Sequence, residues 1–350
     1  MEKNKRLSNI ELLRMLAMLM IIIIHANMLS ISRPTTIDLV NSPIQVITRY
    51  LIESFGIVGV DIFVLISGWF LIRTRAKSFI SFVFQIILLT GGVIFFFVLT
   101  GKTTPNIECL QNIIYISRRD WFVKSYVVLM IIAPILNIFL KNSSIKLQRN
   151  VIVGFFLFAC TYGWFGGARR FFVSGYGPLL FIGLYLLGQF AHNLSENNTC
   201  KLKLSWLFTR SKTFDILVFL SCIITNTILG IICLYSNKRG GYNLIYAYNN
   251  PITIIGALYL LLFFSKIKLQ YNKMINVLAG GSFAAYLLHS NQYVFPYFSE
   301  GVQYIYNNSY GLLCIAVIFL YILFVYIASV IIDFPRILIW NRISNKFNLK

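Results

Sequence analysis

The sequence predicts an all-α membrane protein, a polytopic transmembrane bundle of about ten helices with both termini in the cytoplasm. Of its 350 residues, 58% are hydrophobic and only 12% are charged. A soluble domain of this size could not bury so much apolar surface. Three uncharged runs also reach the roughly 20 residues that a helix needs to cross a bilayer. These runs are Phe79–Leu99, Ile216–Tyr235 and Leu312–Ile332.

The first predicted span, residues 10–30, follows a basic start and has the outline of a signal peptide. However, Arg14 and His25 interrupt its apolar run, and no small-residue cleavage site follows closely. We therefore expect a retained transmembrane helix.

The other predicted spans are apolar runs separated by short polar or basic loops. They cover residues 50–72, 79–99, 122–140, 151–168, 173–191, 214–235, 249–265, 275–297 and 311–332. The span at 151–168 has the weakest pattern, because it is short and ends in glycines. The longest loops have about twenty residues, so we expect one membrane domain over residues 1–350 and no separate soluble domain.

The basic residues are distributed unevenly between the two sides of the membrane. The chain has 31 Lys and Arg against 11 Asp and Glu. When the loops are assigned alternately to the two sides, twenty of these Lys and Arg lie on the side of the N-terminus and ten on the other. Cytoplasmic loops carry the excess of Lys and Arg, so this side is the cytoplasm. We interpret the net charge of +20 as a topology signal that also favours anionic lipid, and expect no nucleic acid partner.

The six cysteines form no Cys-x-x-Cys pair and lie mostly in predicted spans. We interpret them as small packing residues and expect no metal site.

Together the apolar spans and the distribution of basic residues predict a multi-pass protein of the cell membrane, and we expect this to be a bacterial plasma membrane. The sequence leaves the oligomeric state open.

Three ionisable side chains lie on one face of the first predicted helix. Arg14 and His25 are eleven residues apart, so they lie within roughly 20° of each other and about 16 Å apart along the axis. Glu11 falls on the same face, one turn before Arg14. Because ionisable groups inside a membrane span are costly, such a line indicates a functional site.

Each of these residues also has a purely structural interpretation. His25 could only bridge helices, and Arg14 could extend from the cytoplasmic end of the span to the headgroups. In the functional interpretation, neutral His25 is a general base and Arg14 clamps a phosphate. Glu11 then joins the catalytic group chiefly by orienting Arg14 through an ion pair.

The spacing of about 16 Å between Arg14 and His25 suits an acyl-coenzyme A that enters from the cytoplasm. Its pantetheine arm separates the phosphates from the thioester by a distance of that order. Arg73 and Arg75 follow the second span on the cytoplasmic side and could add to the phosphate site. Their position is explained equally well by the ordinary excess of cations there.

Other polar residues in the spans are candidates for the acceptor side. Asp61 has no cation nearby in sequence, so it needs a partner from another helix, water or a substrate hydroxyl. His289 and Asn291 in the ninth span could bind a polar acceptor or only bridge helices. We add Trp121 and Tyr126 as candidates, since aromatic residues commonly line sugar sites.

In their order and spacing, these stretches resemble the acyltransferase-3 family of integral membrane acyltransferases over roughly residues 7–332. The first helix of that family carries an Arg, ten residues and a His, as at Arg14 and His25. Its second span resembles Val60–Gly68, and later motifs resemble Trp121–Tyr126 and Tyr286–His289.

One motif departs from the family. Many members have Arg-x-x-Arg after the second span, where this chain has Arg73-Thr-Arg75-Ala-Lys77. The resemblance therefore leaves open which two side chains form the basic pair.

The resemblance implies an acyl-CoA-dependent O-acetyltransferase of the cell envelope. Such an enzyme moves an acetyl group from cytoplasmic acetyl-CoA, the donor substrate, to a hydroxyl of a cell-surface polysaccharide or its lipid-linked precursor. From the residues alone, a secondary transporter or glycan flippase with a relay of ionisable residues is an alternative. Such folds often have paired halves, and no such symmetry is visible here.

Overall fold

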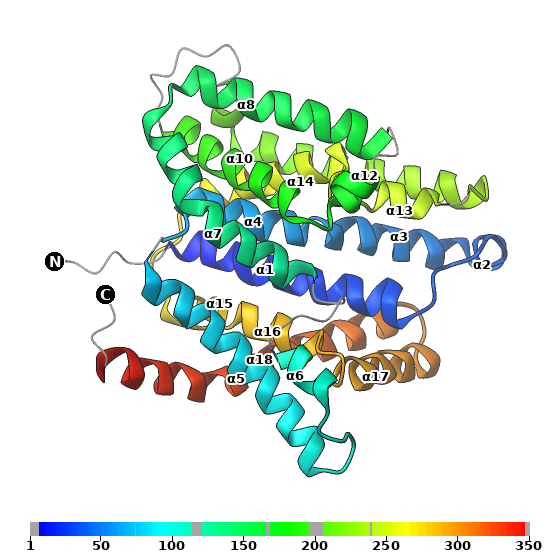
Figure 1. The fold of residues 1–350 in the computed structure, drawn as a ribbon. Helices are drawn as coiled ribbons and strands as arrows, with labels where there is room; N and C mark the ends of the chain where they lie inside the picture. The colour runs from blue at the N-terminus through cyan, green and yellow to red at the C-terminus, as the bar shows by residue number, and fades with distance from the viewer. Residues whose placement is uncertain are drawn as a thin grey trace.

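The computed structural model describes residues 7–73, 75–113, 121–165, 169–196, 206–238 and 240–346. Over these ranges every regular element is a helix, and the helices pack into a single bundle (Figure 1). The predicted all-α polytopic membrane bundle is therefore confirmed. Several cations used for the topology lie outside the described residues, namely Lys3, Lys5, Arg6, Arg118, Arg119, Lys201, Lys203, Arg239 and Lys350.

Six segments within the described ranges are long and apolar enough to cross a membrane. They are Ser8–Ser30, Pro43–Phe70, Ala76–Leu99, Trp121–Asn142, Lys212–Tyr235 and Gly311–Lys346. The remaining predicted spans correspond to shorter or interrupted helices. For example, residues 275–297 contain α15 (Lys273–Gly280), α16 (Ser282–His289) and the start of α17 (Phe295–Asn308).

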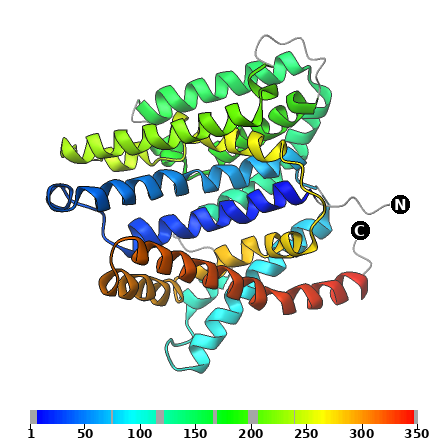
Figure 2. The same cartoon turned by 180° about the vertical axis from the view of Figure 1, so that it is seen from behind.

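Helix α1 (Ser8–Ile24) lies between two groups of helices (Figures 1 and 2). It packs against α3 (Pro43–Ile57) and α4 (Gly59–Phe70) on one side, and against α15 and α16 on the other. The remaining helices flank this centre. They are α2 (Thr36–Asn41), α5 (Ala76–Leu99), α6 (Ile107–Ile113), α7 (Trp121–Asn142), α8 (Ile145–Phe158), α9 (Arg169–Phe172), α10 (Pro178–Glu196), α11 (Trp206–Thr209), α12 (Lys212–Tyr235), α13 (Gly241–Ile245), α14 (Pro251–Ser265) and α18 (Gly311–Lys346).

Close helix contacts in the centre depend on two glycines of α4. A Cβ atom at Gly59 would lie 2.7 Å from the carbonyl oxygen of Ala17 in α1. A Cβ atom at Gly68 would overlap the carbonyl of Tyr185 in α10. Small residues let membrane helices approach closely and gain van der Waals contact, so these glycines allow α4 to fit between α1 and α10.

The first residues of α1 and the last residues of α18 lie at the same end of the bundle (Figure 2). Helix α2 and the C-terminal end of α17 lie at the opposite end. With the orientation that the basic residues predict, α1 begins at the cytoplasmic end. Its continuation, the π-helical segment His25–Ser30, then lies toward the outer end.

Candidate active site

Two histidines from opposite ends of the sequence meet toward the outer end of α1. His25 is the first residue of the π-helical segment, and His289 is the last residue of α16. Nδ1 of His25 lies 2.8 Å from Nε2 of His289, and the ring centres are 5.0 Å apart. The sequence predicts His289 on the acceptor side, and the structure places it directly against the predicted base.

The hydrogen bonds of this pair define where its protons lie. Nδ1 of His289 is 2.5 Å from the carbonyl oxygen of Ala285, which can only accept, so this nitrogen carries a hydrogen. In a neutral ring, Nε2 of His289 is then an acceptor, and Nδ1 of His25 must donate to it. Nε2 of His25 is left with a free lone pair. This is the atom that a general base or a nucleophile uses.

Aromatic rings enclose the pair unequally. The ring of Phe298 packs 5.7 Å from that of His289, and Tyr286 packs 6.2 Å from it. Phe295 lies edge-on to His25 at 6.2 Å. His289 is only 1% exposed, whereas His25 is partly exposed. His25 is therefore the member of the pair that a reactant can reach.

The Glu11–Arg14 pair lies near the N-terminal end of the same helix, which the basic residues predict to be cytoplasmic. Nη1 of Arg14 is 2.6 Å from both carboxylate oxygens of Glu11. The Glu11 side chain is 4% exposed and that of Arg14 is 24% exposed. Fourteen residues at 1.5 Å each place Glu11 about 21 Å along the axis from His25. Glu11 is therefore placed to orient Arg14 and is too distant to exchange a proton with His25 directly.

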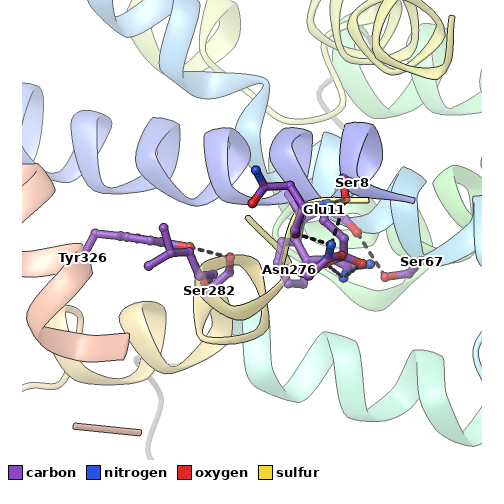
Figure 3. A network of polar contacts seen from close by, with 10 residues as sticks. Ser8, Glu11, Ser67, Asn276, Ser282 and Tyr326 are labelled. Carbon is purple, nitrogen blue, oxygen red and sulfur yellow. Dashed lines mark hydrogen bonds and ion pairs between the residues drawn. The ribbon is translucent and has the colours of Figure 1, made fainter. Parts of the chain in front are cut away.

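Hydrogen bonds between helices join the same network (Figure 3). They connect residues of α1, α4, α7, α15, α16 and α18. The bonded pairs are Asn276–Ser8 at 2.8 Å, Ser67–Tyr126 at 3.0 Å and Ser282–Tyr326 at 3.0 Å. Tyr126, a predicted acceptor-side residue, thus bonds to Ser67 of α4, and none of its hydrogen bonds or ring contacts among the described residues involves the histidine pair.

A continuous series of ring contacts connects Tyr126 with the histidine pair. Tyr126 stacks on Phe122 at 6.0 Å, Phe122 packs 5.0 Å from Tyr286, and Tyr286 packs against His289. An aromatic wall of these three rings therefore leads from the Ser67–Tyr126 hydrogen bond to the imidazoles.

Arg73 and Arg75 line a cavity of about 520 Å³ at the end of the bundle that is predicted to be cytoplasmic. Both side chains are exposed, and they share this cavity with Phe70 and Asn137. The arrangement leaves the two guanidinium groups available to an anion.

A sharp turn after α4 positions Arg73 and Arg75 at this cavity. Leu71 has φ 57°, which is uncommon for a residue with a side chain. The hydroxyl of Tyr185 accepts from the Ile72 amide at 2.9 Å and donates to Asn137 Oδ1 at 2.7 Å. Asn137 Nδ2 in turn donates to the Ile72 carbonyl at 3.2 Å. These three hydrogen bonds fix the backbone that leads to Arg73.

The structure gives the other predicted acceptor residues different surroundings. Trp121 packs against the rings of Tyr176 and Tyr248, at 4.7 and 5.3 Å. Asp61 is fully buried, and neither carboxylate oxygen has a hydrogen-bond partner among the described residues. Asn291 accepts from the Tyr293 amide at 3.0 Å, in the turn before α17. None of these contacts involves His25.

A buried polar cluster holds the π-helical segment His25–Ser30 in place, and none of its residues belongs to the sequence motifs described above. Asn27 Nδ2 donates to Glu53 Oε2 at 2.9 Å, and Asn27 Oδ1 accepts from Nε of Arg49 at 3.2 Å. Nη2 of Arg49 also donates to the Asn27 carbonyl at 2.6 Å, and the Tyr242 hydroxyl donates to Glu53 Oε1 at 2.6 Å. Glu53 lies inside a predicted span, so the rule that intramembrane ionisable residues are functional would have indicated it.

Comparison with known proteins identifies the family of the chain. The sequence model of the acyltransferase-3 family, described as an acyltransferase domain, matches residues 7–334. No curated protein and no solved structure matches the chain. The family match covers every predicted site residue, from Glu11 to Asn291. The chain therefore belongs to the acyltransferase-3 family and is a multi-pass membrane acyltransferase.

Proposed function

We propose that this membrane acyltransferase is an O-acetyltransferase of the bacterial plasma membrane. It moves an acetyl group from cytoplasmic acetyl-CoA to a hydroxyl of a cell-surface polysaccharide or its lipid-linked precursor. The observation that carries the proposal is the free Nε2 of His25, whose other ring nitrogen is bonded to His289.

The donor would extend along α1. Its phosphates bind Arg14, which Glu11 orients, and either Arg73 or Arg75, since guanidinium groups match phosphate geometry. Its pantetheine arm follows the wall of Tyr126, Phe122 and Tyr286. The thioester then reaches His25, about 16 Å along the helix from Arg14.

In direct transfer, His25 acts as a general base. Nε2 takes the proton of the acceptor hydroxyl while its oxygen attacks the thioester carbonyl carbon. The carbon–sulfur bond then breaks, and His25 returns the proton to the departing sulfur, which leaves as the CoA thiol. One carbon–oxygen bond replaces one carbon–sulfur bond, and the Nδ1–H of His25 stays bonded to His289 in both the neutral and the protonated ring.

The same lone pair also suits a second route. Nε2 of His25 attacks the thioester carbonyl carbon, the carbon–sulfur bond breaks, and the CoA thiolate leaves while the ring carries the acetyl group as an acetyl-imidazolium. The acceptor oxygen then attacks the acetyl carbon, the carbon–nitrogen bond breaks, and the hydroxyl proton passes through water to the thiolate. Acetylation of the peptide that contains His25, measured by mass spectrometry after mixing with acetyl-CoA alone, distinguishes this route from direct transfer.

The test of the proposed function uses purified protein in detergent, without a membrane gradient. The acceptor is surface glycan isolated from the producing cells and chemically de-O-acetylated. We expect release of the CoA thiol together with O-acetylated glycan, detected by mass spectrometry. No thioester turnover in detergent, together with gradient-dependent glycan uptake by the same protein reconstituted in vesicles, would instead identify a transporter and contradict the proposal.

A further inference from the structure

A second cavity, of about 410 Å³, opens at the outer end of the bundle. Its walls come from the end of the π-helical segment, the loop before α2, the start of α3 and the last turns of α17. Serine and threonine hydroxyls, amide side chains and the Tyr306 ring line it, together with the guanidinium groups of Arg33 and Arg49.

This outer cavity lies close to His25. Ser30 forms part of its wall, and Ser30 Oγ donates to the carbonyl oxygen of His25 at 3.0 Å. Gln303, another wall residue, donates to the Ser30 carbonyl at 2.8 Å. Five helical residues rise by about 7 Å at most. The cavity therefore ends little more than one turn beyond the imidazole, on the side opposite to the donor.

The hydrogen-bond partners of the two arginines of the outer cavity are all neutral groups. Arg49 is 8% exposed and donates to the oxygens of Asn27 and to the Ile31 carbonyl. Arg33 stacks 3.8 Å over the Tyr242 ring and donates to Asn243 at 3.2 Å. Neither takes part in the ion pairs found among the described residues.

The carboxylate in the cavity wall does not balance them. Asp38 Oδ2 accepts from the Thr35 amide at 2.7 Å and from the Thr35 hydroxyl at 2.8 Å, which closes the N-terminal turn of α2. The wall therefore holds two guanidinium groups and one carboxylate that is already bonded. The carboxylate of Glu53 is near both arginines, but it does not line the cavity and is bonded to Asn27 and Tyr242. The wall favours a ligand that carries both hydroxyls and a negative charge.

We infer that the outer cavity binds the acceptor, and that this acceptor is an acidic glycan with a carboxylate or phosphate near the acetylated hydroxyl. This inference rests on the proposed function and names its acceptor class. Arg33 and Arg49 bind the acidic group, because guanidinium matches carboxylate and phosphate oxygens. The hydroxyl and amide side chains bind the sugar hydroxyls and aim one of them at His25.

The experiment measures acetyl transfer by the full-length protein in nanodiscs. The acceptor is the de-O-acetylated glycan isolated from the producing cells, used intact or after its acidic groups have been removed chemically. Arg33→Gln removes one charge from the cavity, and Arg33→Lys keeps the charge without the planar guanidinium. Lys102→Gln is the matched control, because Lys102 is exposed at the same end, bonded to Tyr297, and does not line the cavity.

We expect Arg33→Gln to raise KM for the intact glycan at least about tenfold, as for the loss of one charged hydrogen bond. Arg33→Lys should have a smaller effect and Lys102→Gln none. Removing the acidic groups from the glycan should raise its KM for the wild-type enzyme by a similar factor. With that glycan, wild type and Arg33→Gln should have the same KM. The inference would be overturned by equal KM values of Arg33→Gln and wild type for the intact glycan. It would also be overturned if the glycan isolated from the producing cells carried no acidic groups.

Two further outcomes are separable. If wild-type protein releases no CoA thiol with the intact glycan, the proposed function itself fails. If Arg33→Gln impairs transfer only in nanodiscs that contain phosphatidylglycerol, and not in phosphatidylcholine, the cavity binds a lipid headgroup and the acceptor assignment is overturned.

Discussion

Nδ1 of His25 and Nε2 of His289 lie 2.8 Å apart, although 264 residues separate them in the sequence. The Ala285 carbonyl fixes the tautomer of His289, and His289 fixes that of His25. A buried side chain thus determines which nitrogen of the more accessible imidazole keeps its lone pair. In our mechanism His289 is a positioning residue, because it acts through His25.

We predict that His289→Ala lowers kcat about 10- to 100-fold, the usual cost of losing a residue that orients a reacting imidazole. KM for acetyl-CoA should stay unchanged, because the phosphate site is at the other end of α1. His289→Gln should recover part of kcat, since its amide oxygen can accept from His25. Steady-state kinetics on folded protein measures both constants. An increase in KM without a fall in kcat would contradict the positioning role.

We predict that Arg14→Ala raises KM for acetyl-CoA at least about tenfold, because a charged contact to phosphate is lost. S-acetyl-pantetheine carries the thioester without the phosphates, so its kcat/KM should be the same in Arg14→Ala and wild type. Comparing the two donors separates phosphate binding from damage to the fold. Equal losses with both donors would contradict the phosphate role of Arg14.

We predict that Asp61→Asn does not lower the thermal stability of the protein. Burying a carboxylate without a hydrogen-bond partner is costly, and the amide removes the charge at nearly the same volume. Thermal unfolding in detergent measures the change in Tm. If Asp61 also contacts the acceptor, KM for the glycan should rise in this variant. A clear fall in Tm would contradict the prediction, because it would show that the Asp61 carboxylate stabilises the folded protein.

We predict that Gly68→Ala destabilises the protein by about 1–3 kcal/mol, as other overpacking substitutions do. The new Cβ would overlap the Tyr185 backbone, so α4 and α10 would have to separate. Gly92→Ala in α5 is the control, because no atom lies within 4 Å of its Cβ position. That change should be neutral or stabilising by up to about 1 kcal/mol. Equal Tm values for both variants would contradict the close packing of α4 on α10.

Much of the fold could be predicted from local sequence patterns. The apolar runs define the long helices, and the i, i+3 spacing of Glu11 and Arg14 predicts the ion pair that the structure contains. The limits of the interrupted helices were harder to predict. Gly281 separates α15 from α16 inside a mostly apolar run, and hydropathy does not record where a backbone turns.

The contacts of the site depend on tertiary packing, which a single sequence does not reveal. Nothing in the residues around His25 or His289 indicates that they touch each other. The hydrogen bonds among Tyr185, Asn137 and Ile72 likewise join α10, α7 and the turn after α4. Asn27 and Arg49 belong to no recognised motif, and only their contacts with each other and with Glu53 give them a role.

The most direct test is acetyl transfer from acetyl-CoA to the de-O-acetylated native glycan by His25→Ala, compared with wild type at equal amounts of folded protein. His192→Ala is the matched control, since His192 packs against Trp69 in α4, away from the histidine pair. We predict that His25→Ala loses at least about 100-fold in transfer rate, as expected for a missing general base. His192→Ala should transfer at the wild-type rate. Wild-type transfer by His25→Ala would contradict the assignment of His25 as the catalytic residue.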